Sequence, residues 1–160
     1  MNWYKAAAKH IVPVVTSERF QTMTSKEKGR LAENRRLTPE LQRLFFTEPY
    51  ERKSDVLWYL ALNSSITQET QRLFFTEPYE RKDTVLWYLA LNPKITQETQ
   101  RLFFTEEYPD KNDVLGNLAW NPIFLQNFTP EQMLIVKNAA RGVGRLHVLK
   151  KRLEQLAGVP

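Results

Sequence analysis

The sequence contains three consecutive copies of one 29-residue segment, which begin at Leu37, Ile66 and Ile95. The first two copies are identical at 22 of their 29 positions. A period of roughly 20 to 50 residues is typical of stacked repeat proteins, in which each unit buries its apolar face only against its neighbours. Such scaffolds usually bind other molecules and seldom catalyse reactions. The repeat therefore favours a binding protein over an enzyme.

The composition is that of a folded domain. The chain of 160 residues is 42% hydrophobic and 12% aromatic, which is too apolar for a disordered chain. It contains no cysteine, which excludes disulfides and cysteine-based metal sites. Lysines, a histidine and Pro13 interrupt the apolar residues near the N-terminus, so we expect no signal peptide and no membrane span. We therefore expect a soluble, cytoplasmic protein that makes no contact with a membrane.

The net charge of +5 is unevenly distributed along the chain. Residues 1–36 carry eight basic and three acidic side chains, a net charge of +5, and residues 124–160 carry six and two, a net charge of +4. The repeats, residues 37–123, carry nine basic and thirteen acidic side chains, a net charge of −4. We therefore expect no continuous basic groove for phosphate groups along the repeats.

Each copy contains the signals of two helices. Thr38, Thr67 and Thr96 are candidate N-caps of the first helix, because each is followed by Pro or Gln and then by Glu. We expect residues 44–46 and their equivalents to form the core side of this helix, with Gln42 and Arg43 pointing away from it. The segment TEPYERK then ends the helix at a proline in the first two copies.

The second helix of each copy is predicted within the run DVLWYLALN, with Ser54, Asp83 and Asn112 as N-caps. In the first copy, Trp58 and Leu62 lie opposite a broad apolar arc, so we expect the helix to be buried nearly all round. That arc consists of Val56, Leu57, Leu60 and Ala61.

An asparagine closes each copy, at Asn63, Asn92 and Asn121. The phrase Leu-Ala-x-Asn to which it belongs also occurs at residues 31–34, so we infer a degenerate leading unit before the three full ones. We expect these asparagines to satisfy main-chain groups at helix ends rather than to bind a ligand.

The run VLWYLALNPKITQETQRLF contains the pattern Val-Leu-x-x-Leu-Ala-x-Asn-Pro-x-x-Thr, followed by a leucine-bearing helix. In this it resembles the leucine-rich repeat variant family, whose short two-helix repeats are akin to HEAT repeats. The resemblance covers about residues 31–125 and implies an all-α fold, a right-handed α-solenoid. The TEPYERK insert makes the period of 29 longer than is typical of the family, and the iron–sulfur domain of one known type cannot exist without cysteine. The family shares no catalytic residues, so the resemblance implies no activity.

We expect a single structural domain in three parts. Residues 1–36 form an N-terminal helical cap that includes the degenerate unit, residues 37–123 form the three repeats, and residues 124–160 form a basic C-terminal helical cap. Within this last part, Thr129-Pro130-Glu131 predicts the start of a helix that Gly142 and Gly144 split.

The end of the chain has an apolar stripe with basic residues beside it. This pattern is typical of a cap on the last unit, but it also fits a basic surface for nucleic acid or an acidic protein, or a self-association contact. The stripe consists of Leu146, Leu149, Leu153 and Leu156, and the basic residues are Arg145, Lys150, Lys151 and Arg152.

The sequence offers little for catalysis. The only histidines, His10 and His147, are far apart and have no spacing typical of metal ligands. The carboxylates recur with the repeat, as expected of helix starts and solvated faces rather than of acid–base pairs. Gly142-Val143-Gly144 lacks the rest of a phosphate-binding loop. We therefore expect no enzyme activity, no metal and no cofactor.

Repeated aromatic and basic residues are the binding candidates, because stacking places equivalent positions in rows. Tyrosine, tryptophan and arginine are enriched at the energetic centres of protein interfaces, and they can also stack on nucleic-acid bases. Packing between units is the alternative role of the tryptophans. The candidates are Arg43, Arg72 and Arg101; Tyr50, Tyr79 and Tyr108; Trp58 and Trp87; and the loop cations Arg52, Lys53, Arg81 and Lys82.

The third copy departs from the others at these positions, because Gly116 and Asn117 replace the tryptophan and the tyrosine that follows it. A binding surface would therefore be strongest over the first two full units. The sequence predicts a non-catalytic module that binds a protein or peptide. The alternative is a nucleic-acid-binding protein that uses the basic terminal segments.

Overall fold

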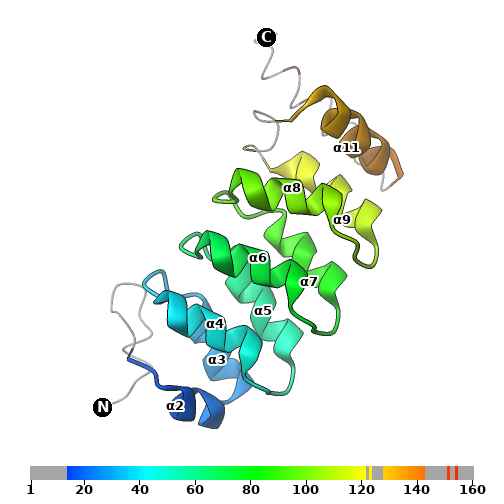
Figure 1. Ribbon diagram of the computed structural model, residues 1–160. Coiled ribbons are helices and arrows are strands. Elements are labelled where there is room, and N and C mark those ends of the chain that lie inside the picture. Colours follow the sequence, from blue (N-terminus) through cyan, green and yellow to red (C-terminus); the bar gives the residue numbers. More distant parts are fainter. Residues whose placement is uncertain (1–13, 122, 124–127, 143–150, 152–153, 155–160) are drawn as a thin grey trace.

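The computed structural model describes residues 14–121, 123, 128–142, 151 and 154. This part of the chain is all-helical and contains no strand. Its elements follow one another in chain order from α2 at one end of the molecule to α11 at the other (Figure 1). They are α2 (Ser17–Thr22), α3 (Ser25–Ala32), α4 (Pro39–Thr47), α5 (Lys53–Leu62), α6 (Gln68–Thr76), α7 (Lys82–Leu89), α8 (Gln97–Thr105), α9 (Lys111–Asn117), the 3₁₀ helix η1 (Leu118–Trp120) and α11 (Pro130–Gly142).

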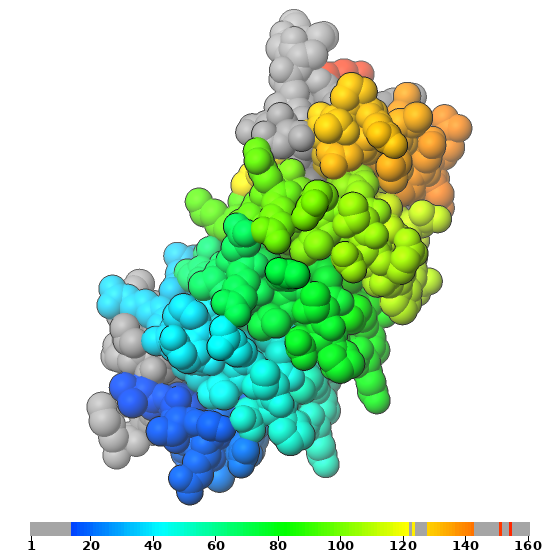
Figure 2. Space-filling model, in the orientation of Figure 1, coloured from blue at the N-terminus to red at the C-terminus, as the bar shows by residue number. Residues whose placement is uncertain are grey.

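The helices of the three copies lie in two rows. Helices α4, α6 and α8 form the first row and begin at equivalent positions, Pro39, Gln68 and Gln97. Helices α3, α5, α7 and α9 form the second row, in which each helix packs against the next. The space-filling view shows the copies as successive bands along the molecule (Figure 2). Each copy therefore packs mainly against the copies that precede and follow it in the chain.

The first-row helices begin as the sequence predicts. The hydroxyl of Thr38 accepts a hydrogen bond from the main-chain N–H of Leu41 at 3.2 Å, and Thr67 and Thr96 cap α6 and α8 in the same way. Each cap satisfies one of the N–H groups that have no partner within the helix. The prediction of threonine N-caps is confirmed.

The second-row helices begin differently from the prediction. Helices α5, α7 and α9 follow Arg52, Arg81 and Asp110, each in the left-handed backbone region, and no side chain caps their first N–H groups. Ser54 lies inside the first turn, and its hydroxyl donates instead to the main-chain carbonyl of Glu80 in the next copy. The predicted caps at Ser54, Asp83 and Asn112 are therefore wrong, because the chain enters the helix through a left-handed residue.

The core lies between the rows and between successive copies. Val56, Leu57, Leu60 and Ala61 are buried as predicted, whereas Leu62 is 40% exposed, so α5 is not buried all round. Phenylalanine rings of consecutive first-row helices meet edge to face, for example Phe46 and Phe74 with centroids 4.9 Å apart.

Gln42 lies inside this core, contrary to the prediction that it points away. It is 1% exposed, and its amide donates to the carbonyl of Leu37 at 3.0 Å. Its Oε1 atom accepts hydrogen bonds from the N–H of Thr67 at 3.0 Å and from the hydroxyl of Thr70 at 2.6 Å. The next copy supplies both of these donors, so the glutamine becomes a core residue only when the copies stack.

The asparagines that close the copies link each copy to the one before it. The amide of Asn92 donates to the carbonyls of Ala61 and Asn63 at 2.6 and 3.0 Å, and its Oδ1 accepts from the N–H of Lys94 at 2.9 Å. Asn63 and Asn121 make the equivalent bonds. The predicted structural role of these residues is confirmed.

Both ends of the described array carry additional packing. Phe20 of α2 meets Phe45 edge to face at 5.0 Å, and Phe128 meets Phe104 in the same manner at 5.9 Å. Helix α11 starts after Thr129, whose hydroxyl accepts from the N–H of Gln132 at 3.2 Å, as the sequence predicts. It packs against α9 and η1 and so covers the last second-row helix (Figure 1).

Candidate interaction surface

The three loop tyrosines lie mostly inside the structure. Each hydroxyl donates to a main-chain carbonyl near the end of the preceding first-row helix, and burial raises the pKa of all three phenols. Tyr50, Tyr79 and Tyr108 bond to Phe45, Phe74 and Phe103 at 2.7, 2.6 and 2.7 Å. These tyrosines therefore stabilise the loops and offer little surface to a partner.

In the first two copies a proline leaves the carbonyl that accepts from the tyrosine without its helical donor. The carbonyl of Phe45 would accept from the N–H of residue 49 if α4 continued, but Pro49 has no N–H. The hydroxyl of Tyr50 supplies the missing donor. The same relation holds in the next copy, where Pro78 precedes Tyr79.

The loop lysines are also structural. The ammonium of Lys53 donates to the carbonyl of Phe46 at 2.7 Å and lies 5.1 Å from the ring centroid of Tyr50. Lys82 repeats both contacts in the next copy. Burial lowers the pKa of both lysines, and neighbouring glutamates partly oppose that effect.

Arg52 and Arg81 remain exposed at their left-handed positions. The Nε of Arg52 lies 2.8 Å from Oδ2 of Asp55, and Nη1 of Arg81 lies 3.8 Å from Oδ1 of the same carboxylate. One carboxylate thus holds guanidinium groups from two consecutive loops.

The first-row arginines are exposed on a different side of the molecule. Arg43 pairs with Glu69 of the next copy at 2.6 Å, and Arg72 and Arg101 occupy the equivalent exposed positions. An exposed pair of this kind contributes only about 0.2 to 1 kcal/mol. This row presents one exposed guanidinium group in each copy.

The outward side of the second row carries a group of partly exposed aromatic and aliphatic side chains. Trp58, Tyr59 and Leu62 follow helical spacing on α5, and their equivalents lie on or just after α7. We name this surface the aromatic face; it consists of Trp58, Tyr59, Leu62, Trp87, Tyr88 and Leu91.

The rings of the aromatic face form one continuous stack across two copies. Trp58 stacks on Tyr59 with centroids 3.8 Å apart and on Tyr88 with centroids 4.9 Å apart. Tyr88 in turn meets Trp87 edge to face at 5.1 Å. The predicted tryptophan row is thus interleaved with tyrosines. Because two tyrosine rings stack on Trp58, its π-surface is largely occupied within the protein.

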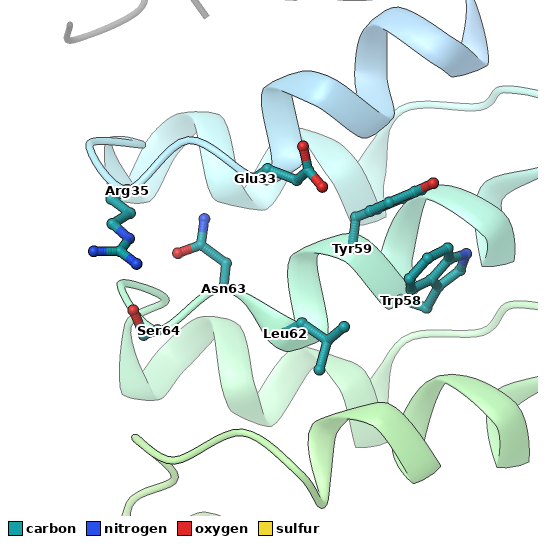
Figure 3. Close-up of a pocket in the computed structure, with 7 residues that line it drawn as sticks. All are labelled: Glu33, Arg35, Trp58, Tyr59, Leu62, Asn63 and Ser64. Carbon is teal, nitrogen blue, oxygen red and sulfur yellow. The ribbon is translucent and has the colours of Figure 1, made fainter. Parts of the chain in front are cut away.

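An open depression of about 360 Å³ adjoins this stack, between the turn after α3 and helix α5 (Figure 3). Glu33 and Arg35 come from the leading unit, and Leu62 and Tyr59 come from the first full copy. A smaller depression of about 150 Å³ lies on the opposite side of the stack, where Asp55 and Arg81 adjoin the rings. The aromatic face is therefore bordered by charged residues at both ends of its helices.

The aromatic face ends where the sequence changes. The position of Trp58 is Gly29 in the leading unit, and a β-carbon there would lie 3.3 Å from the ring of Tyr59. At the other end, Gly116 and Asn117 are buried, and the Asn117 amide donates to the carbonyl of Trp87 at 2.8 Å. Helix α11 packs on α9 and η1 at this end, where Trp120, the equivalent of Leu62 and Leu91, is 40% exposed.

The remaining candidates lie mainly at the C-terminus. Lys151 is exposed in a helical position. Both histidines and the rest of the basic and leucine groups, that is Arg145, Lys150, Arg152, Leu146, Leu149, Leu153 and Leu156, lie outside the described residues.

The described residues contain neither a candidate metal site nor a candidate membrane span. Within them, no cluster of three or more histidine, cysteine, aspartate or glutamate side chains is placed to bind a metal ion. Within the same ranges, no helix is long and apolar enough to span a bilayer.

Comparisons with protein-family models, with curated proteins and with solved structures gave no match. The resemblance to the leucine-rich repeat variant family therefore stays a prediction.

Tyr59, Tyr88, Leu62 and Leu91 are residues of the aromatic face that were not among the candidates predicted from the sequence. Leu62 and Leu91 lie four positions after the tryptophans and therefore share their helix face, whereas Tyr59 and Tyr88 lie one position after them and join the surface through ring stacking.

Proposed function

We propose that the protein is a non-catalytic α-solenoid module that binds a protein partner through the aromatic face. The observation that carries this proposal is the placement of two tryptophans, two tyrosines and two leucines on one outward side of α5 and α7. Aromatic side chains at the centre of a surface, with charged groups at its rim, are typical of protein interfaces.

The variation between copies supports the proposal. The interior positions, such as the asparagines and the first-row phenylalanines, keep their identity through the three copies. The tryptophan of the aromatic face occurs only in the first two copies, and its equivalents in the units on either side are Gly29 and Gly116. Packing between copies does not require tryptophan at this position, since two of the four units have glycine there. Packing between copies therefore does not account for the tryptophans, which favours a role in recognition.

The experiment compares the proteins retained by the wild-type chain with those retained by a variant of the aromatic face. A tagged chain and its Leu62→Asp/Leu91→Asp variant are incubated with native cell extract, and the proteins retained by each are identified by mass spectrometry. We expect the wild-type chain to retain a partner that the variant loses. Arg72→Asp, on the exposed first row, is the matched control and should retain it. Equal retention by all three chains would contradict the proposal.

Binding of nucleic acid is the alternative outcome, and a salt titration identifies it. Phosphate contacts release counterions, so retention of a single-stranded oligonucleotide must fall steeply as salt rises. The stacking of Trp58 between two tyrosines argues against a platform for bases, because a base needs an accessible ring face. We expect no salt-sensitive retention of the oligonucleotide.

A further inference from the structure

The two ends of the second-row helices carry opposite charge. We define the loop edge as residues 47–55, 76–84 and 105–113, which lead into α5, α7 and α9, and the turn edge as residues 33–38, 62–67 and 91–96, which follow α3, α5 and α7. The loop edge contains ten acidic and five basic side chains, a net charge of −5. The turn edge contains three basic side chains and one acidic side chain, a net charge of +2. The aromatic face lies between an acidic edge and a basic one.

Both edges adjoin the aromatic face directly. On the turn edge, Arg35 lines the same depression as Leu62 and Tyr59 (Figure 3). On the loop edge, Asp55 lines a depression with Trp58 and Tyr88. A molecule that covers the rings therefore also meets the two charged edges.

A surface with an apolar centre and edges of opposite charge is complementary to itself. A two-fold axis parallel to the long axis of the stack would place the loop edge of one copy of the protein against the turn edge of the other. The same rotation places the two aromatic faces against each other, as in an isologous interface. We propose that the occupant of the aromatic face is a second copy of this chain. This inference rests on the proposed function, since it names the partner of the same surface.

The size of the face indicates that the edges must take part. Helix α5 has 10 residues and is thus about 15 Å long. The two second-row helices that carry the face, α5 and α7, spaced 8–10 Å apart, give a face of roughly 15 by 20 Å, about 300 Å². A stable interface buries about 800 Å² per partner, so the aromatic face alone is too small. The charged edges supply the remaining contact, and reversing one of them should weaken the dimer.

The experiment measures the oligomeric state of the full chain by sedimentation velocity at low salt over a wide range of concentration. We expect the wild type to pass from monomer to dimer as concentration rises. Two charge-reversed variants test the edges separately. The turn-edge variant is Arg35→Glu/Arg36→Glu, which changes the net charge of that edge from +2 to −2. The loop-edge variant is Glu51→Arg/Glu80→Arg/Glu106→Arg, which changes the net charge of that edge from −5 to +1; all five side chains are exposed.

Each variant carries like charges on both edges, so each should dimerise at least about tenfold more weakly than the wild type. An equimolar mixture of the two should associate again, because each supplies the edge that the other needs. Arg72→Glu, on the first row, should behave like the wild type. Circular dichroism should show unchanged helix content in every variant.

Three results would overturn the inference. They are a wild-type chain that is monomeric at every concentration, single variants that dimerise like the wild type, and a mixture that fails to associate. The wild type could instead be monomeric and retain a different protein that the Leu62→Asp/Leu91→Asp variant does not retain. That result would overturn the self-association and leave the proposed function standing.

Discussion

Residues in the contacts between copies keep their identity from copy to copy, whereas residues of the aromatic face change. Between copies, the asparagine that closes each unit recurs without change, and each such residue makes the same three hydrogen bonds. On the aromatic face, one position is glycine, tryptophan, tryptophan and glycine in successive units. The two glycines are buried, whereas the two tryptophans are partly exposed. The difference distinguishes residues that hold the units together from residues that determine the chemistry of the exposed surface.

The largest loss of stability is expected from Asn92→Ala. Asn92 is fully buried, and its amide satisfies the carbonyls of Ala61 and Asn63. Leaving these buried acceptors without a donor should lower the free energy of unfolding by about 2 to 4 kcal/mol. Urea unfolding followed by circular dichroism measures the loss.

Asn112→Ala is the matched control for this substitution. Asn112 is exposed at the start of α9, so its removal should change the free energy of unfolding by less than about 0.5 kcal/mol. Equal losses from the two substitutions would show that the closing asparagines do not link the copies.

A smaller loss is expected from Tyr79→Phe, which removes the hydroxyl that bonds to the carbonyl of Phe74 at 2.6 Å. The substitution should cost about 1 kcal/mol at neutral pH, measured by urea unfolding. Tyr88→Phe, on the aromatic face, is the control for a tyrosine hydroxyl to which the structure assigns no hydrogen bond, and it should have little effect.

The Tyr79 substitution should also change the dependence of stability on pH. Burial holds the pKa of Tyr79 above its ordinary value, so the folded protein keeps a proton that the unfolded chain loses above about pH 10. This contribution is complete below pH 10 and is lost as the pH rises further. Lys53 and Lys82, whose pKa is lowered, act with the opposite sign near the same pH. The difference between wild type and Tyr79→Phe isolates the tyrosine, and it should shrink from pH 9 to pH 11. A constant difference would contradict the burial of the phenol.

The smallest effect is expected from Arg43→Ala on the first row. The pair with Glu69 is exposed, with side chains 52% and 61% accessible, so its loss should change the free energy of unfolding by less than about 1 kcal/mol. The loss should fall further when salt is added. A loss as large as that of Asn92→Ala would mean that the first-row arginines hold the copies together.

Local signals in the sequence predicted much of the helical structure. The threonine caps, the helix after Thr129 and the role of the closing asparagines follow from short-range patterns, and the structure has them. The left-handed residues at Arg52 and Arg81 were not predicted, because neither is glycine or asparagine. Gln42 was misplaced because its partners belong to the next copy and exist only after stacking.

The candidate surface was predicted only in part. Repetition identified Trp58 and Trp87, and it also brought in the loop tyrosines, because equal spacing does not distinguish a surface row from an interior one. The hydrogen bonds of the tyrosine hydroxyls to the ends of the first-row helices show that the loop tyrosines belong to an interior row. The tyrosines of the aromatic face were not predicted, because their role follows from ring stacking between copies.

Site-specific photo-crosslinking tests the central claim, that the aromatic face is the binding surface, most directly. A photoreactive phenylalanine analogue is placed at position 62 or 91 on the aromatic face and at position 72 or 101 on the first row, in otherwise identical chains. We expect crosslinks to a protein, whether a second copy of the chain or another partner, from positions 62 and 91 and few from positions 72 and 101. Crosslinks that arise mainly from positions 72 and 101, or equally from all four, would contradict it.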